Sequence, residues 1–128
     1  MNSLVRNITC DNDILHLAKS GDYRFLIDFM SSDETKDLLK SFALEYGGKY
    51  LEKTIELKNI LKNVLINEKY SLLVKEGALY GLEDFAYVKE YRYELKDFFN
   101  NLLETSKDAI IKNFSEEIVE DIEDGLYE

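Results

Sequence analysis

The chain has 128 residues, no proline and six glycines, and 45% of its residues are hydrophobic. This is the length of one ordinary globular domain, and it is long enough to bury a core. Sandwiches, barrels and linkers need more turn residues than this composition supplies. We therefore predict an all-α fold in a single domain spanning residues 1–128.

Acidic side chains outnumber basic ones by 26 to 16, which gives a net charge of −10 and an isoelectric point near 4.6. Nucleic acids and anionic membranes attract basic surfaces, so neither is expected as a direct partner. The negative charge favours a basic protein partner. The alternative is that the charge serves only to keep the protein soluble.

The expected location is the cytoplasm. The sequence has no uncharged apolar run of about 18 residues, and the first residues, MNSLVRNITCDND, contain no apolar core of a signal peptide. The single Cys10 cannot form a disulfide within the chain, which agrees with a reducing compartment.

Hydrophobic periodicity and turn residues predict six helical segments. Ser32 or Asp33 is expected to cap the second segment, and Gly47 and Gly48 are expected to end it. The segments cover about 12–30 with a break near Ser20 and Gly21, then 33–46, 49–67, 71–87, 89–104 and 106–125.

The segments pair into three antiparallel helical hairpins, at about 12–46, 48–87 and 88–125, joined internally by short polar turns. A helical hairpin that recurs about every 40 residues is typical of α-solenoids, in which each hairpin buries its apolar face against its neighbours.

The middle hairpin contains the sequence INEKYSLLVKEGALYGL, which resembles the second helix of a HEAT repeat. Glu68 lies in the turn, Val74 and Lys75 take the valine–arginine position, and Ala78 and Leu82 take the inner packing positions. The resemblance is specific only around Glu68 to Phe85. It implies a short right-handed solenoid of three stacked hairpins, and the alternative is an irregular helical bundle.

Two glycines, Gly77 and Gly81, lie inside this helix, where each costs about 1 kcal/mol relative to alanine. On a helical wheel they share one arc with the apolar residues Val74, Ala78 and Leu82. We interpret them as sites where a neighbouring backbone approaches closely, so that packing offsets the cost. No glycine-rich phosphate-binding motif is present.

The opposite face of this helix alternates acids and tyrosines, a combination that suits a protein interface. The last helix is acidic, with no basic residue from position 116 onward, and a basic partner would relieve its like-charge repulsion. An acidic end that merely caps the repeats is the alternative. The candidate partner-binding residues are Glu76, Tyr80, Glu83, Asp84, Tyr87, Glu116, Glu117, Glu120, Asp121, Glu123 and Asp124.

The sequence offers no catalytic or metal-binding signature. His16 is the only histidine and Cys10 the only cysteine, so a zinc site lacks ligands. Adjacent acids such as Glu83 and Asp84 diverge by about 100° on a helix and do not converge on one ion. We therefore expect no enzyme activity, no metal and no cofactor.

These observations favour a non-catalytic module that binds a basic protein. The most specific version is an immunity or inhibitor protein that neutralises a nuclease-like toxin, by analogy of size and charge. One alternative is the helical-repeat scaffold of a nucleic-acid-processing enzyme, which would use the basic residues Lys49, Lys53, Lys58 and Lys62. Another is a structural subunit that forms oligomers.

Overall fold

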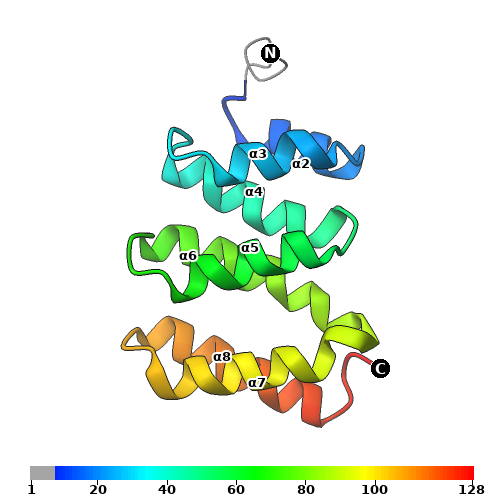
Figure 1. The fold of residues 1–128 in the computed structure, drawn as a ribbon, viewed down its shortest axis with the longest axis vertical. Helices are drawn as coiled ribbons and strands as arrows, with labels where there is room; N and C mark the ends of the chain where they lie inside the picture. The colour runs from blue at the N-terminus through cyan, green and yellow to red at the C-terminus, as the bar shows by residue number, and fades with distance from the viewer. Residues whose placement is uncertain (1–7) are drawn as a thin grey trace. The chain divides into compact units, whose positions relative to one another are not determined.

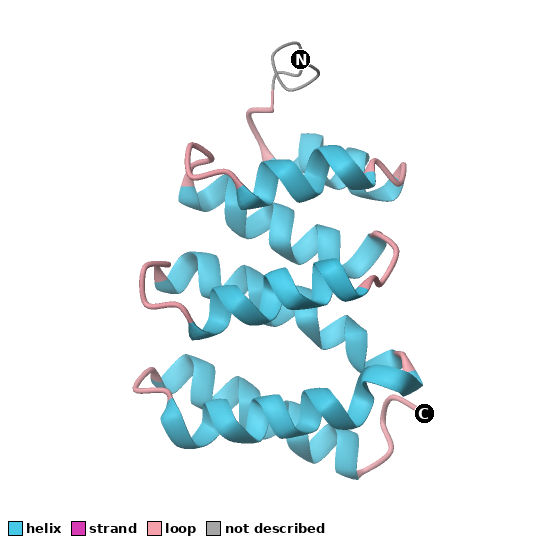
Figure 2. Cartoon of the chain, viewed as in Figure 1, coloured by secondary structure: helices cyan, strands magenta, loops and turns pink. Residues whose placement is uncertain are grey.

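The computed structural model describes residues 8–128, and every regular element within them is a helix (Figures 1 and 2). This confirms the predicted all-α class. In chain order the elements are α2 (Asp11–Lys19), α3 (Tyr23–Ser31), α4 (Asp37–Tyr50), α5 (Ile55–Ile66), α6 (Leu72–Glu83), the 3-10 helix η1 (Asp84–Tyr87), α7 (Lys89–Thr105) and α8 (Ala109–Glu123).

The chain divides into two compact units, Met1–Leu82 and Glu83–Glu128. The described part of the first unit contains α2 to α5 and all of α6 except its last residue. The second unit contains η1, α7 and α8. The N-terminal stretch in which a signal peptide was sought lies partly outside the described residues.

In the first unit, α4 packs against α2, α3 and α5. The predicted break between the first two helices is confirmed, because Gly21 has a φ of +78° and the Asp22 amide donates to the Leu17 carbonyl. The buried core of these helices includes Ile14, Ala18, Leu26, Met30, Ala43, Leu44, Leu57 and Leu61.

Helices α4 and α6 meet backbone to backbone through buried glycines. A β-carbon at Gly77 would overlap the Ser41 carbonyl oxygen, and one at Gly81 would overlap the Leu44 carbonyl oxygen. A β-carbon at Gly48 would overlap the backbone of Gly81 itself. The interpretation of Gly77 and Gly81 as close-packing residues is therefore confirmed.

The same contact shows that the predicted end of the second helical segment is wrong. Gly47 and Gly48 lie inside α4, which continues to Tyr50. Gly48 has an ordinary helical backbone and is used for its lack of a side chain against Gly81, so it does not act as a helix stop.

Two predicted helix starts also need correction. Helix α4 begins at Asp37, so neither Ser32 nor Asp33 caps it. The segment predicted from residue 49 begins only at Ile55, where the Thr54 hydroxyl accepts the Leu57 amide at 3.1 Å.

We expect Gly81→Ala to destabilise the protein, because the new methyl group would meet backbone that cannot rotate away. Overpacking costs about 1–3 kcal/mol, whereas alanine gains about 1 kcal/mol in helix propensity, so we expect a net loss of up to about 2 kcal/mol. Urea denaturation measures the free energy of unfolding. Gly47→Ala is the control, because its β-carbon would meet the movable end of the Met30 side chain at 2.7 Å. Equal stabilities of the two variants would contradict this account.

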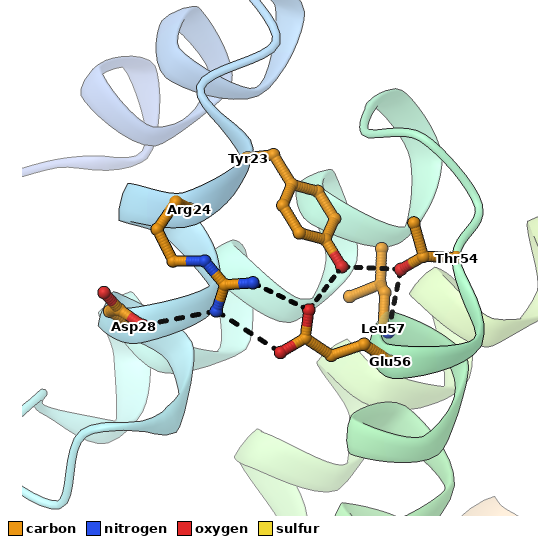
Figure 3. A network of polar contacts seen from close by, with 6 residues as sticks. All are labelled: Tyr23, Arg24, Asp28, Thr54, Glu56 and Leu57. Carbon is orange, nitrogen blue, oxygen red and sulfur yellow. Dashed lines mark hydrogen bonds and ion pairs between the residues drawn. The ribbon is translucent and has the colours of Figure 1, made fainter.

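A polar network joins α3 to the start of α5 (Figure 3). Arg24 forms a forked ion pair with Glu56, with nitrogen–oxygen distances of 2.9 and 3.3 Å. The Tyr23 phenol donates to Glu56 at 2.8 Å and lies 2.6 Å from the Thr54 hydroxyl. The hydrogen bonds from Arg24 and then from Tyr23 lower the pKa of Glu56.

The network should make stability depend on pH. The folded-state pKa of Glu56 lies below its unfolded value, so its contribution is present above the unfolded pKa and disappears as the pH falls through the folded one. We expect Glu56→Gln to be less stable than the wild type near neutral pH and to differ less at about pH 3. Urea denaturation at both pH values checks this, and a difference that does not depend on pH would contradict it.

The second unit is built on a helical hairpin, in which α7 and α8 pack along each other. Phe99 and Phe114 approach with ring centroids 6.4 Å apart, and Lys96 pairs with Glu123 at 3.3 Å. The apolar residues buried in this unit include Phe85, Leu95, Phe99, Leu102, Ile111, Ile118 and Ile122.

Candidate functional site

Helix α8 has a buried face and an outward face, and the sequence determines both. The Asp108 carboxylate accepts the Ile110 amide at 2.9 Å and caps the start of the helix. The buried stripe contains Ile111, Ser115, Ile118, Val119 and Ile122, which recur at helical spacing.

Carboxylates cover the outward face of α8, which we call the acidic face of α8. Asp121 is half-buried and the others are exposed. The helix has no basic residue in its last turn, so the carboxylates there also oppose the helix dipole. The acidic face of α8 consists of Glu116, Glu117, Glu120, Asp121, Glu123 and Asp124.

The negative charge of the chain is concentrated in the second unit. Residues 83–128 contain 14 acidic and five basic side chains, a net charge of −9. Residues 1–82 contain 12 acidic and 11 basic side chains, a net charge of −1. A long-range electrostatic interaction with a basic molecule would therefore arise mainly from the second unit.

Two of these five basic residues contribute little to the surface of the second unit. Arg92 is only 7% exposed, and Lys96 is paired with Glu123. Arg92 donates to three backbone carbonyls, those of Ala86 at 2.8 Å, Tyr127 at 3.1 Å and Tyr87 at 3.3 Å. The other three, Lys89, Lys107 and Lys112, are exposed.

The predicted face of acids and tyrosines, which we call the ridge, does not continue as one α-helix; it consists of Glu76, Tyr80, Glu83, Asp84 and Tyr87. Helix α6 ends at Glu83, and the chain continues as the 3-10 helix η1 to Tyr87. A 3-10 helix has about three residues per turn, so the prediction that Tyr87 lies on the same α-helical face as Glu76 and Tyr80 is wrong. Glu76 and Tyr80 belong to the first unit, whereas the other three ridge residues, Glu83, Asp84 and Tyr87, belong to the second.

Exposure differs along these residues. Tyr80 and Tyr87 are exposed, at 40% and 62%, whereas Glu76, Glu83 and Asp84 are half-buried. The tyrosines therefore offer contact area, but the carboxylates between them are only partly accessible.

Tyr127, in the segment after α8, contacts two of the ridge residues. The sequence did not predict this contact. The Tyr127 phenol donates to Glu83 at 3.2 Å, and its ring meets Tyr87 edge-on with centroids 4.9 Å apart. Burial, and then the negative charge of Glu83, raise the pKa of the Tyr127 phenol, so it remains a donor at neutral pH. No sequence signal points to Tyr127: after a helix-ending glycine such as Gly125, the apolar residue that commonly packs back is the next one, here Leu126, which is 66% exposed.

The lysines of the nucleic-acid alternative do not form an open cationic stripe. Lys58 is buried, while Lys49, Lys53 and Lys62 are half-buried. The Lys53 ammonium donates to the Lys49 carbonyl at 3.2 Å. These four residues therefore give that alternative no support.

A groove of about 1060 Å³ lies beside α3 in the first unit. Phe25, Phe29, Leu38 and Leu39 supply apolar surface, and the charged residues around them have both signs. Leu38 is 53% exposed there. The mixed charge selects no basic partner, so the groove is not part of the candidate site.

Residues 8–128 show neither a metal site nor a membrane-spanning helix. No group of three histidine, cysteine or acidic residues in this range is arranged to hold a metal ion. None of the helices in this range combines the length and the apolar character that crossing a membrane requires. His16 and Cys10 are both exposed on or beside α2.

Comparisons of the chain with protein-family models, with curated proteins and with solved structures found no match. The resemblance to HEAT repeats therefore stays a prediction from the sequence, as does the stacking of three hairpins.

The acidic face of α8 should reduce the stability of the protein. Glu120 has like charges four residues away on both sides, at Glu116 and Asp124, and each such pair costs a few tenths of a kcal/mol. We expect Glu120→Gln to raise the free energy of unfolding at low salt and to have less effect at high salt. Denaturation of Glu104→Gln, an exposed change at the end of α7, is the control. A loss of stability in Glu120→Gln would contradict the repulsion.

Proposed function

We propose that the chain is a non-catalytic interaction module that binds a basic protein through its second unit. The observation that carries the proposal is the segregation of charge, which leaves −9 on residues 83–128 and −1 on the rest. A surface of one sign raises the rate of encounter with an opposite charge and disfavours partners of like charge.

The acidic face of α8 supports this proposal, because its carboxylates lower the stability of the helix that carries them. Like charges on successive turns and acids at a helix C-terminus both weaken a helix. Solubility would need net charge but no particular helix face. A basic partner would turn the same repulsion into attraction, so binding accounts for the placement of the carboxylates as well as for their number.

The most specific form of the proposal remains an inhibitor of immunity type, in which the acidic surface covers a basic, nuclease-like partner. We also propose that the helices follow a HEAT-like repeat, on the residues from Glu68 to Phe85. Exposed Tyr87 would add aromatic contact area beside the carboxylates of the second unit.

The test measures which basic proteins the chain captures from the native cell. It compares the wild type with two triple variants that lose the same number of negative charges. One is E116Q/E117Q/E120Q on α8, and the other is E34Q/E52Q/E68Q in the first unit. All six glutamates are exposed. Exposed ion pairs contribute about 0.2–1 kcal/mol each, so we expect the α8 variant to bind a captured partner roughly tenfold more weakly. The first-unit variant should bind almost as the wild type does.

Binding should also weaken as salt is raised from low to moderate concentration. If a basic partner is captured equally by both triple variants, the acidic face of α8 is not its site. If no basic protein is captured at low salt, the proposed function is wrong. For the inhibitor form, adding the chain should abolish the nuclease activity of the captured partner.

A further inference from the structure

The four residues after Asp124, which we call the tail, fold back onto the second unit. Gly125 has a φ of +77°, its amide donates to Ile122, and the Leu126 amide donates to Asp121 at 2.9 Å. These two bonds form a Schellman turn at the end of α8. The turn reverses the chain and brings Tyr127 to η1 and the end of α6.

Three contacts hold Tyr127, which is only 6% exposed. Its phenol donates to Glu83 at 3.2 Å, its ring meets Tyr87 edge-on, and its carbonyl accepts from Arg92 at 3.1 Å. The preceding residue, Leu126, is 66% exposed. The tail is thus held within the second unit against Glu83, Tyr87 and Arg92, through the side chain and the carbonyl of Tyr127.

Two of the three groups that Tyr127 contacts, Glu83 and Tyr87, would also suit a basic partner, whereas the third, Arg92, is itself a cation. A guanidinium or ammonium group would form a charge-assisted hydrogen bond with Glu83, which is stronger than the bond from a neutral phenol. The ring of Tyr87 could accept the same cation on its face. A cationic side chain can therefore compete directly with Tyr127.

We propose that the tail is an intramolecular strap, in which Tyr127 occupies Glu83 and packs edge-on against the exposed Tyr87 until a basic partner displaces Tyr127. The inference rests on the proposed function, and it adds a second contact point to the acidic face of α8.

The structure also separates release of the strap from unfolding. Arg92 donates to Ala86 at 2.8 Å and to Tyr87 at 3.3 Å as well as to Tyr127, so two of its three contacts lie within residues 86–87. These two bonds remain when the tail leaves. Residues 86–87 therefore keep their contact with Arg92 in the open state.

The test measures binding of a fluorescent oligo-arginine peptide to the full chain at low salt. The apparent affinity of the wild type equals the affinity of the open state multiplied by the fraction of molecules whose tail is open. If the tail is closed in about nine molecules of ten, Tyr127→Ala should therefore bind the peptide about tenfold more tightly. Leu126→Ala is the matched control and should bind as the wild type does. Tyr127→Phe keeps the ring but loses the bond to Glu83, so it should bind with intermediate affinity even if Tyr127→Ala fails to fold.

Hydrogen exchange gives a second, independent result. Adding the peptide to the wild type should speed exchange at the amides of residues 126–128, because the peptide replaces the tail. Unchanged exchange there, or unchanged affinity in folded Tyr127→Ala and Tyr127→Phe, would overturn the strap.

The outcomes separate the strap from the proposed function. If E116Q/E117Q/E120Q weakens peptide binding while the Tyr127 variants change nothing, the strap is wrong and the proposed function stands. If neither the wild type nor Tyr127→Ala binds the peptide, the acidic surface does not bind cations and both proposals are wrong.

Discussion

The backbone contact between α4 and α6 is the constraint on which the first unit depends. At Gly48, Gly77 and Gly81 the two helices meet mainly through main-chain atoms, with only the small Ser41 side chain beside Gly77, so the backbone largely sets their separation. Such a contact cannot adapt by changing rotamers, unlike one made by leucines or methionines. It therefore fixes which face of α6 is buried, and the exposed position of Tyr80 follows from that choice.

The two units differ in what their charged side chains do. In the first, opposite charges nearly balance, and pairs such as Arg24 with Glu56 join separate helices. In the second, the carboxylates on α8 outnumber the available cations, and Arg92 is used inside the unit to hold backbone carbonyls. A carboxylate without a partner adds nothing to folding, so its position has to be explained by solubility or by binding.

Local pattern was sufficient to predict the class of fold, the break at Gly21 and the close packing of Gly77 and Gly81. It failed at the end of α4, because the local sequence around Gly48 is also typical of a glycine that ends a helix. Its partner, Gly81, lies 33 residues later, and only the packed structure shows the pairing. The acidic residues of α8 could be found from composition. The contact of Tyr127 with Glu83 could not, because the two residues lie 44 positions apart and no periodic pattern links them.

The proposed binding surface has two parts that differ in accessibility, and this difference implies an order of events. The acidic face of α8 is exposed and acts at a distance, so it would govern the first encounter and its dependence on salt. The second part, Glu83, is half-buried and accepts a hydrogen bond from Tyr127, so it acts only at contact. Because the tail follows directly from the last turn of α8, a partner attracted to that helix is already beside the strap that it has to displace. Charge would then set the rate of association, and competition with Tyr127 for Glu83 would decide which basic partners stay bound.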